Sequence, residues 1–142
     1  MQRSFFILIF LLLHRTNGPA FAFVNRPFPQ HASYTSGTIG PNNVTQQQLD
    51  DSTEAFYDRW KSRYLKNDCG PGLYYVAWDG GGSTLCVSEG QGYGMLITAI
   101  MAGYDPDAQT YFDGLYAFYK AHPSSINPRL MAWKQITGCV SD

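Results

Sequence analysis

The segment Val87–Met95 (VSEGQGYGM) places three glycines where a helical pattern begins, and this restricts how the chain can fold. Glycine inside a helix costs about 1 kcal/mol relative to alanine. Gly90 and Gly94 are four residues apart and share one face of such a helix, whereas Gly92 lies on the opposite face. A single close helix contact does not account for all three glycines. We therefore expect other parts of the protein, or a ligand, to approach this backbone from more than one side.

Two further segments carry helical periodicity, one before and one after this segment. The three predicted helices cover residues 45–66, 88–101 and 106–121. Thr45 and Gln48 have the spacing of a capping box, as do Ser88 and Gln91, and Asp105 is the expected cap of the third helix. Helices joined by short loops pack as antiparallel hairpins, so the sequence predicts an all-α stack.

The segments between these helices have a different composition. Residues 67–87 hold two glycine clusters around an apolar piece, which predicts a long ordered loop with a short strand pair as an option. Leu130–Lys134 is the best other strand candidate. Residues 23–44 mix proline, glycine, serine and asparagine without periodicity, which is typical of an extended lead-in.

The first 22 residues have the pattern of a cleaved secretory signal peptide. Arg3 precedes an apolar run from Phe5 to Leu13, and residues 20–22 read Ala-Phe-Ala. The run is far shorter than the roughly 20 residues of a membrane-spanning helix, although a membrane anchor is the alternative interpretation. We expect an exported protein without membrane contact after cleavage.

The three cysteines of the chain suit an oxidising compartment. Cys69 and Cys86 bracket a glycine-rich loop, and we predict a disulfide between them, worth roughly 3 kcal/mol by loop closure. Two free buried thiols are the alternative, and Cys139 has no evident partner. The histidines show no ligand spacing with the cysteines, so no metal or other cofactor is expected.

Composition also narrows the partners. The net charge of −1 provides no basic surface for nucleic acid. Ten tyrosines and three tryptophans suit a surface that is apolar and also forms hydrogen bonds, as sugar-binding clefts are. The glycine spacing between Gly90 and Gly94 does not match a dinucleotide fingerprint, and Glu89 would repel a phosphate at that helix start.

Glu89 has two interpretations at this stage. Acidic residues are common in a first helical turn because the helix dipole favours negative charge there. The surrounding glycines favour a second interpretation, in which they leave room for a substrate beside the carboxyl group. Asp79, which precedes three glycines, is most simply a turn residue.

The segment Val87–Met95 followed by Leu130–Lys134 (LMAWK) resembles the amino-terminal part of glycoside hydrolase family 8, the inverting endoglucanases, chitosanases, xylanases and lichenases. Cys69–Val76 (CGPGLYYV) and Gly80–Ser83 (GGGS) are also similar to the lead-in of some bacterial members. The resemblance covers roughly residues 45–138. It implies that Glu89 is the general acid of glycoside hydrolysis.

The resemblance further implies that Trp133 is a platform on which a sugar ring stacks, whereas its apolar neighbours alone favour a core position. Tyr93 and Gln91 are candidate sugar contacts, although capping and packing explain them equally well. Inverting hydrolysis needs an acid and a base carboxylate about 6.5–9.5 Å apart. An acid has to keep its proton near neutral pH, which calls for aromatic walls or a second carboxylate beside Glu89.

Family members fold as a barrel of six helical hairpins and are more than twice this length. The general base is expected beyond Trp133, in a segment resembling Ala-Thr-Asp, and the surroundings of Asp142 do not match it. The resemblance therefore predicts an incomplete (α/α)6 barrel, with residues 45–142 as the first part of a catalytic domain that is inactive alone.

The expected function of the complete enzyme is hydrolysis of a β-1,4-linked polysaccharide, with a cellulose-type glucan as the main candidate. A non-catalytic carbohydrate-binding or structural remnant is the alternative. A small disulfide-bonded secreted interaction protein is a third interpretation, which predicts a compact monomer.

Overall fold

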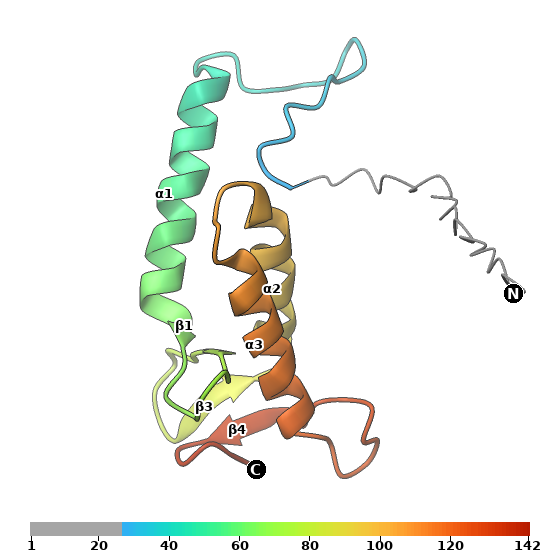
Figure 1. The fold of residues 1–142 in the computed structure, drawn as a ribbon. Helices are drawn as coiled ribbons and strands as arrows, with labels where there is room; N and C mark the ends of the chain where they lie inside the picture. Colours follow the sequence, from blue (N-terminus) through green and yellow to red (C-terminus); the bar gives the residue numbers. More distant parts are fainter. Residues whose placement is uncertain (1–26) are drawn as a thin grey trace, which may run out of the picture.

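The computed structural model describes residues 27–142, so the predicted signal peptide and the first residues of the predicted lead-in lie outside the described residues. In chain order the elements are α1 (Gln46–Tyr64), β1 (Leu65–Lys66), β2 (Tyr75–Val76), β3 (Thr84–Val87), α2 (Ser88–Ile100), the 3₁₀ helix η1 (Met101–Gly103), α3 (Ala108–Ala121), β4 (Lys134–Ile136) and β5 (Val140–Ser141). The three α-helices stand side by side, and the strands gather at one end of them (Figure 1).

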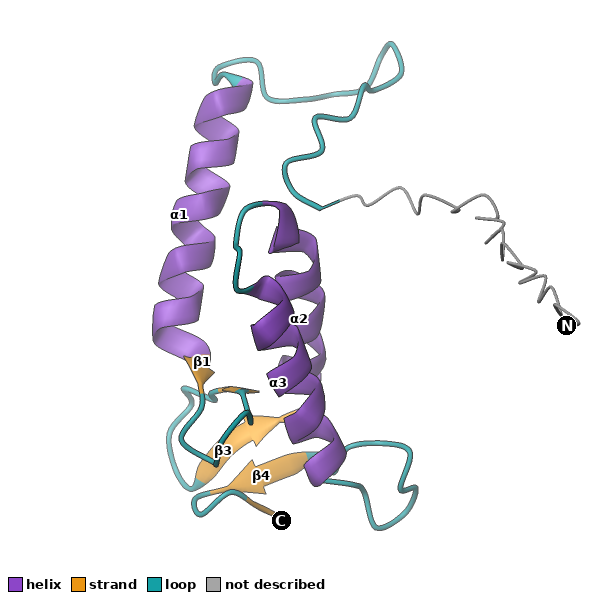
Figure 2. Ribbon diagram, in the orientation of Figure 1, coloured by secondary structure: helices purple, strands orange, loops and turns teal. Residues whose placement is uncertain are grey.

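The prediction of an all-α fold is only partly correct. The helices dominate, but β1 pairs with β2, and β3, β4 and β5 form a second antiparallel sheet, as the colours of Figure 2 show. The strands lie in the segments between and after the helices, where glycine clusters interrupt the helical pattern before β3 and Gly138 separates β4 from β5. The structure is therefore a partial helical fold with two small sheets at the base.

Helix α1 begins as the sequence predicts. The Gln48 backbone N–H donates to the Thr45 hydroxyl at 3.2 Å, and the Thr45 backbone N–H donates to the Gln48 side chain at 2.8 Å, which completes the capping box. The helix ends at Tyr64 rather than Lys66, because Leu65 and Lys66 pair with β2 instead.

Helices α2 and α3 pack against each other and against β2. A Cβ atom on Gly94 would lie 2.4 Å from Val76 Cγ2, and one on Gly114 would lie 2.3 Å from Tyr74 Cδ2. Glycine at these two positions is what lets β2 lie directly on the helices. Gly92, on the other side of α2, has nothing within 4 Å of its Cβ position, so residues 27–142 approach α2 closely from one side only.

The turn before α3 differs from the prediction. The helix begins at Ala108, and its N-cap is Asp107, without a side-chain cap. Asp105 is buried instead, where it accepts hydrogen bonds from the Asp107 backbone, the Tyr57 hydroxyl and the Lys61 ammonium. Asp105 therefore ties α1 to the start of α3, because a buried carboxylate needs such donors.

Strand β4 lies slightly later than the predicted strand at Leu130–Lys134. It begins at Lys134, which pairs with Val87, while Met131 forms only an isolated bridge with Pro123. Tyr75, Cys86, Phe118 and Met131 form the buried core between this sheet and α3.

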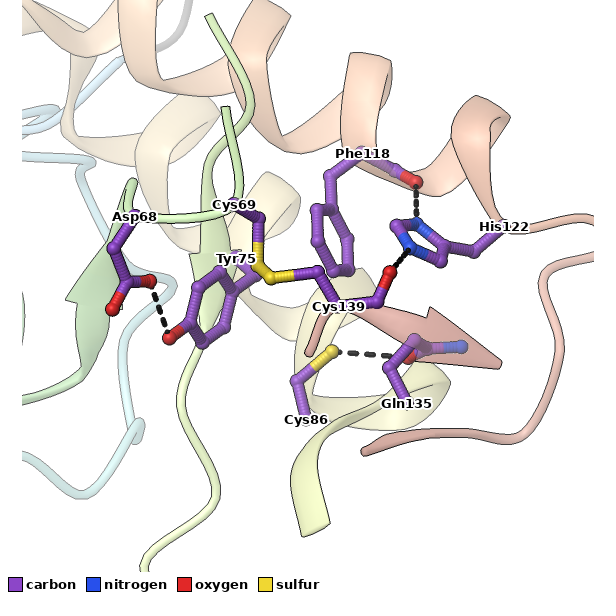
Figure 3. The surroundings of a disulfide bond; sticks show 8 residues. All are labelled: Asp68, Cys69, Tyr75, Cys86, Phe118, His122, Gln135 and Cys139. Atoms are coloured by element: carbon purple, nitrogen blue, oxygen red, sulfur yellow. Dashed lines mark hydrogen bonds between the residues drawn. A yellow bond between two sulfur atoms is a disulfide. The ribbon is translucent and has the colours of Figure 1, made fainter. Parts of the chain in front are cut away.

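The disulfide joins Cys69 to Cys139, so the predicted pair of Cys69 with Cys86 is wrong (Figure 3). Cys86 lies in β3 with its side chain in the core, where its thiol contacts Gln135 Oε1 at 3.0 Å. Burial raises the pKa of this thiol to about 12, so it is not a reactive thiolate. Cys139 lies in the turn between β4 and β5, and its Cα is 5.7 Å from that of Cys69.

Candidate active site

Pairing of β3 with β4 brings the two motif segments together. Val87 pairs with Lys134, and the Ser88 backbone N–H donates to the Trp133 carbonyl oxygen at 2.9 Å. Glu89 is the next residue along α2, so it lies one residue from this contact. The Glu89 and Trp133 side chains are both exposed, and the accessible fraction of Trp133 is 65%. Trp133 is therefore a surface residue rather than a core residue.

Glu89 lines a pocket of about 200 Å³ with two aromatic side chains. Trp78 and Tyr93 are the aromatic residues of its lining, which Val76, Ala77, Val87 and Gly90 complete. Such a mixture of flat apolar rings and a carboxyl group suits a sugar ring. Glu89 itself is exposed, so residues 27–142 supply the aromatic walls expected of an acid site but not its burial.

The start of α2 lacks the predicted capping box. The N-cap is Val87 rather than Ser88, and no side chain caps the helix. The reason is that Val87 is the last residue of β3 and already has the extended backbone of an N-cap, so the helix follows the strand directly. Glu89 still lies in the first turn of the helix, as the sequence predicted.

Gln91 is not available to a sugar in this structure. Its side chain is completely buried, and its Nε2 donates to the carbonyl oxygens of Tyr74 at 3.0 Å and Leu115 at 2.8 Å. Its Oε1 accepts from the Val76 backbone N–H at 3.1 Å. Gln91 was a candidate sugar contact, but its side chain instead has a structural role in this structure. It links α2 to β2 and to α3.

The sequence that forms this pocket matches a known protein family. The model of glycosyl hydrolases family 8 matches residues 27–137, which include the Glu89 pocket and Trp133. The chain belongs to glycosyl hydrolase family 8.

Several known proteins are similar to the chain over most of its length. A beta-glucanase of Niallia circulans is 63% identical over 116 residues, which cover 82% of this chain and 28% of that protein. An endoglucanase of Bacillus sp. strain KSM-330 is 49% identical over 115 residues, which cover 76% of this chain and 25% of that protein. The chain thus spans less than a third of the relatives it matches.

A solved structure has the same fold in this region. The apo structure of a beta-1,3-1,4-glucanase from Paenibacillus sp. X4 matches with a TM-score of 0.75 and 59% sequence identity, covering 83% of this chain and 30% of that one. The arrangement of helices and strands in this family 8 chain is therefore that of a segment of a larger protein.

Trp78 is a site residue that the sequence did not single out. It is half exposed and faces the Glu89 pocket. A Cβ atom on Gly80 would lie 2.5 Å from Trp78 Nε1, so the indole occupies space that only glycine leaves free. An aromatic residue two positions before a glycine cluster was the available signal. Tyr93, which the sequence did predict, is 57% exposed on the other side of the pocket.

Residues 27–142 of this family 8 chain show no cluster of three His, Cys, Asp or Glu side chains with the geometry of a metal site. The pocket is lined by one carboxyl group, two aromatic rings and the aliphatic residues Val76, Ala77 and Val87, together with Gly90. A carboxyl group donates a proton when it is protonated and accepts one when it is ionised.

Proposed function

We propose that this chain provides the acid side of the active site in an enzyme that hydrolyses β-glucan, with β-1,4-linked glucose units as the main substrate. The observation that carries the proposal is the position of Glu89 at the start of α2, in a pocket between Trp78 and Tyr93. Two similar proteins, a beta-glucanase and an endoglucanase, support this substrate class.

In the proposed mechanism, Glu89 donates a proton to the glycosidic oxygen as the bond to the sugar breaks. A second carboxylate activates water on the opposite face of the sugar, about 6.5–9.5 Å from the acid, so the configuration is inverted. We do not assign Asp142 as this base, since its carboxylate is paired with Lys134. We propose that the base and the groups that bury Glu89 belong to the part of the catalytic domain that the relatives have and this chain does not cover.

The aromatic residues position the substrate in this proposal. Trp78 and Tyr93 hold a sugar ring against Glu89, and Trp133 offers its exposed ring from the segment just before β4. Stacking a ring against a flat aromatic surface buries apolar C–H groups and leaves the sugar hydroxyls free for hydrogen bonds. Positioning of this kind aligns the glycosidic oxygen with the acid.

We also propose that the protein acts outside the cell. The signal-like pattern of residues 1–22 supports export, and the disulfide between Cys69 and Cys139 suits an oxidising compartment. Among residues 27–142, none of the helices combines the length and apolarity needed to cross a bilayer.

The proposal is tested with Glu89→Gln in an enzyme that joins this chain to the remainder of a family 8 catalytic domain. Loss of the acid should lower kcat on β-glucan about 10²–10⁴-fold, while binding of a cello-oligosaccharide stays within about twofold. Glu54→Gln is the matched control, because Glu54 lies on α1 away from the pocket and should leave kcat unchanged.

Unchanged turnover in Glu89→Gln would reject the acid role. The better interpretation would then be a non-catalytic chain that binds oligosaccharide through Trp133 and the tyrosines. In that chain, Glu89 would only stabilise the start of α2. Robust glucan hydrolysis by the 142-residue chain alone would reject the proposal that its activity depends on groups outside it.

A further inference from the structure

A second groove adjoins the Glu89 pocket along the same side of the molecule. It has a volume of about 380 Å³ and shares Val76, Ala77, Gly90 and Tyr93 with that pocket. Its remaining walls come mainly from Trp60 and Tyr64 at the end of α1, from Asp79, and from α2. The two hollows are therefore one continuous depression, with Glu89 toward one end and Asp79 toward the other.

Asp79 is held in place by groups on two sides. Its Oδ2 accepts hydrogen bonds from the Tyr64 hydroxyl at 2.9 Å and from Arg63 Nη2 at 3.1 Å. The preceding backbone is fixed as well, because the Ala77 N–H donates to the Tyr64 carbonyl and the Trp78 N–H donates to the Leu85 carbonyl, both at 2.8 Å. Asp79 is therefore more than the simple turn residue that the sequence indicated.

The second oxygen of this carboxylate is unused. Within residues 27–142, no group donates a hydrogen bond to Asp79 Oδ1, and the side chain is 55% exposed at the groove. A carboxylate with one oxygen fixed and the other free presents a pre-oriented acceptor, and hydrogen bonds to charged acceptors are among the stronger ones.

A third hollow provides a useful contrast. It lies between α1 and α2 farther along the helices and is lined by apolar and aromatic side chains with Thr53 as its polar member. Such a surface suits packing against other protein. The groove at Asp79 combines aromatic rings with an oriented carboxylate, which is the combination that recognises a sugar ring.

We propose that the groove lined by Trp60, Tyr64 and Asp79 is a second sugar subsite, which takes the pyranose next to the one held at Glu89. Asp79 Oδ1 accepts hydrogen bonds from the hydroxyls of that ring, and Tyr93 lies between the two rings of the glucan chain. This inference rests on the proposed function, since it extends the same substrate across the same depression.

The three tryptophans of the chain make a direct test available, because each indole N–H gives one NMR signal and each ring has a separate location. Trp60 lines the second groove and also the third hollow, Trp78 lines the Glu89 pocket, and Trp133 lies just before β4. The probe is cellotetraose, titrated into the uniformly ¹⁵N-labelled chain. We expect the Trp60 and Trp78 signals to shift together, with one common dissociation constant.

The variant Asp79→Asn removes the charge and keeps the shape. We expect it to weaken cellotetraose binding about tenfold, as loss of a charged acceptor predicts. Tyr64→Phe removes only the hydroxyl that orients the carboxylate and should weaken binding about threefold. Asp113→Asn, an exposed carboxylate on α3 that accepts from Gln109, is the matched control and should bind as the unsubstituted chain does.

The outcomes separate the two proposals. If the indole signal of Trp78 shifts while that of Trp60 does not, and Asp79→Asn binds cellotetraose like the control, the proposal of a second subsite is wrong. The proposed function then stands. If no indole signal of the unsubstituted chain shifts even at the highest cellotetraose concentration of the titration, both the subsite and the glucan-binding role of the Glu89 pocket are rejected.

Discussion

The backbone N–H of Ser88 donates a 2.9 Å hydrogen bond to the carbonyl oxygen of Trp133, although the two residues lie in different motifs of the sequence. This bond continues the ladder between β3 and β4 up to the first residue of α2. The proposed acid and the proposed stacking tryptophan are thus held by the same strand pair, and any change that separates the strands should disturb both.

The first prediction concerns Trp78 and the glycine beside it. Trp78→Ala should weaken cellotetraose binding about tenfold, because it removes an aromatic wall of the Glu89 pocket. Gly80→Ala should weaken binding about threefold, because the new Cβ would force the indole out of its position. Isothermal titration calorimetry measures both.

Gly40→Ala is the control for the glycine substitution, since nothing lies within 4 Å of its Cβ position. Equal binding by Gly80→Ala and Gly40→Ala would show that the orientation of Trp78 does not matter.

The second prediction concerns Gln91. Gln91→Ala should lower the free energy of unfolding by about 2–4 kcal/mol, because it leaves the Val76 N–H and the Tyr74 and Leu115 carbonyls without their partner in a buried place. Urea unfolding followed by circular dichroism measures the change. Gln47→Ala, which removes an exposed hydrogen bond to Asp51, should change stability by less than about 0.5 kcal/mol. A loss in Gln91→Ala no larger than in this control would contradict the structural role.

The third prediction concerns the disulfide. Replacing Cys69 and Cys139 together by serine should lower the free energy of unfolding by about 3–4 kcal/mol, since the bond links positions separated by 70 residues and restricts the unfolded chain. Cys86 should react with a thiol reagent only after denaturation, because it is buried. Peptide mapping that recovers a Cys69–Cys86 link from the native protein would contradict this assignment.

The fourth prediction concerns acid sensitivity through Asp105. Burial acts to raise the pKa of this carboxyl, but hydrogen bonds from Lys61 and Tyr57 outweigh it and hold the pKa below the ordinary value. A carboxyl with a lowered folded pKa stabilises the fold above its unfolded pKa of about 3.9, and this stabilisation is lost as the pH falls through the folded pKa.

Urea unfolding at a series of pH values between 7 and 3 tests whether stability falls with pH in this direction. The unsubstituted chain should lose stability steadily below about pH 4, and Asp105→Asn should be less stable at neutral pH but show a flatter pH profile. Identical slopes for the two proteins would mean that Asp105 does not contribute to acid sensitivity.

Local signals in the sequence predicted local structure well. The capping box at Thr45 was correct because both partners lie within one helical turn and no other group competes for them. The same spacing at Ser88 and Gln91 failed because Gln91 finds three buried backbone partners from β2 and α3, which a single helix does not reveal. Tertiary hydrogen bonds therefore decided the role of this side chain.

The long-range features were harder to predict. The pairing of β3 with β4 places Cys139 near Cys69 and directs the Cys86 side chain into the core. The spacing of the cysteines in the sequence does not indicate this strand pairing. The proposed role of Glu89 followed from the resemblance, whereas the proposed roles of Trp78 and Asp79 depend on how residues 77–79 lie beside α1 and α2.

The covalent link between Cys69 and Cys139 encloses α2, α3 and the proposed acid within one closed loop of the chain. A protease that cuts any single peptide bond between these two cysteines would leave the resulting pieces attached to each other. If the protein acts outside the cell, as proposed, the segment that carries Glu89 would survive such a cut without separating from α1.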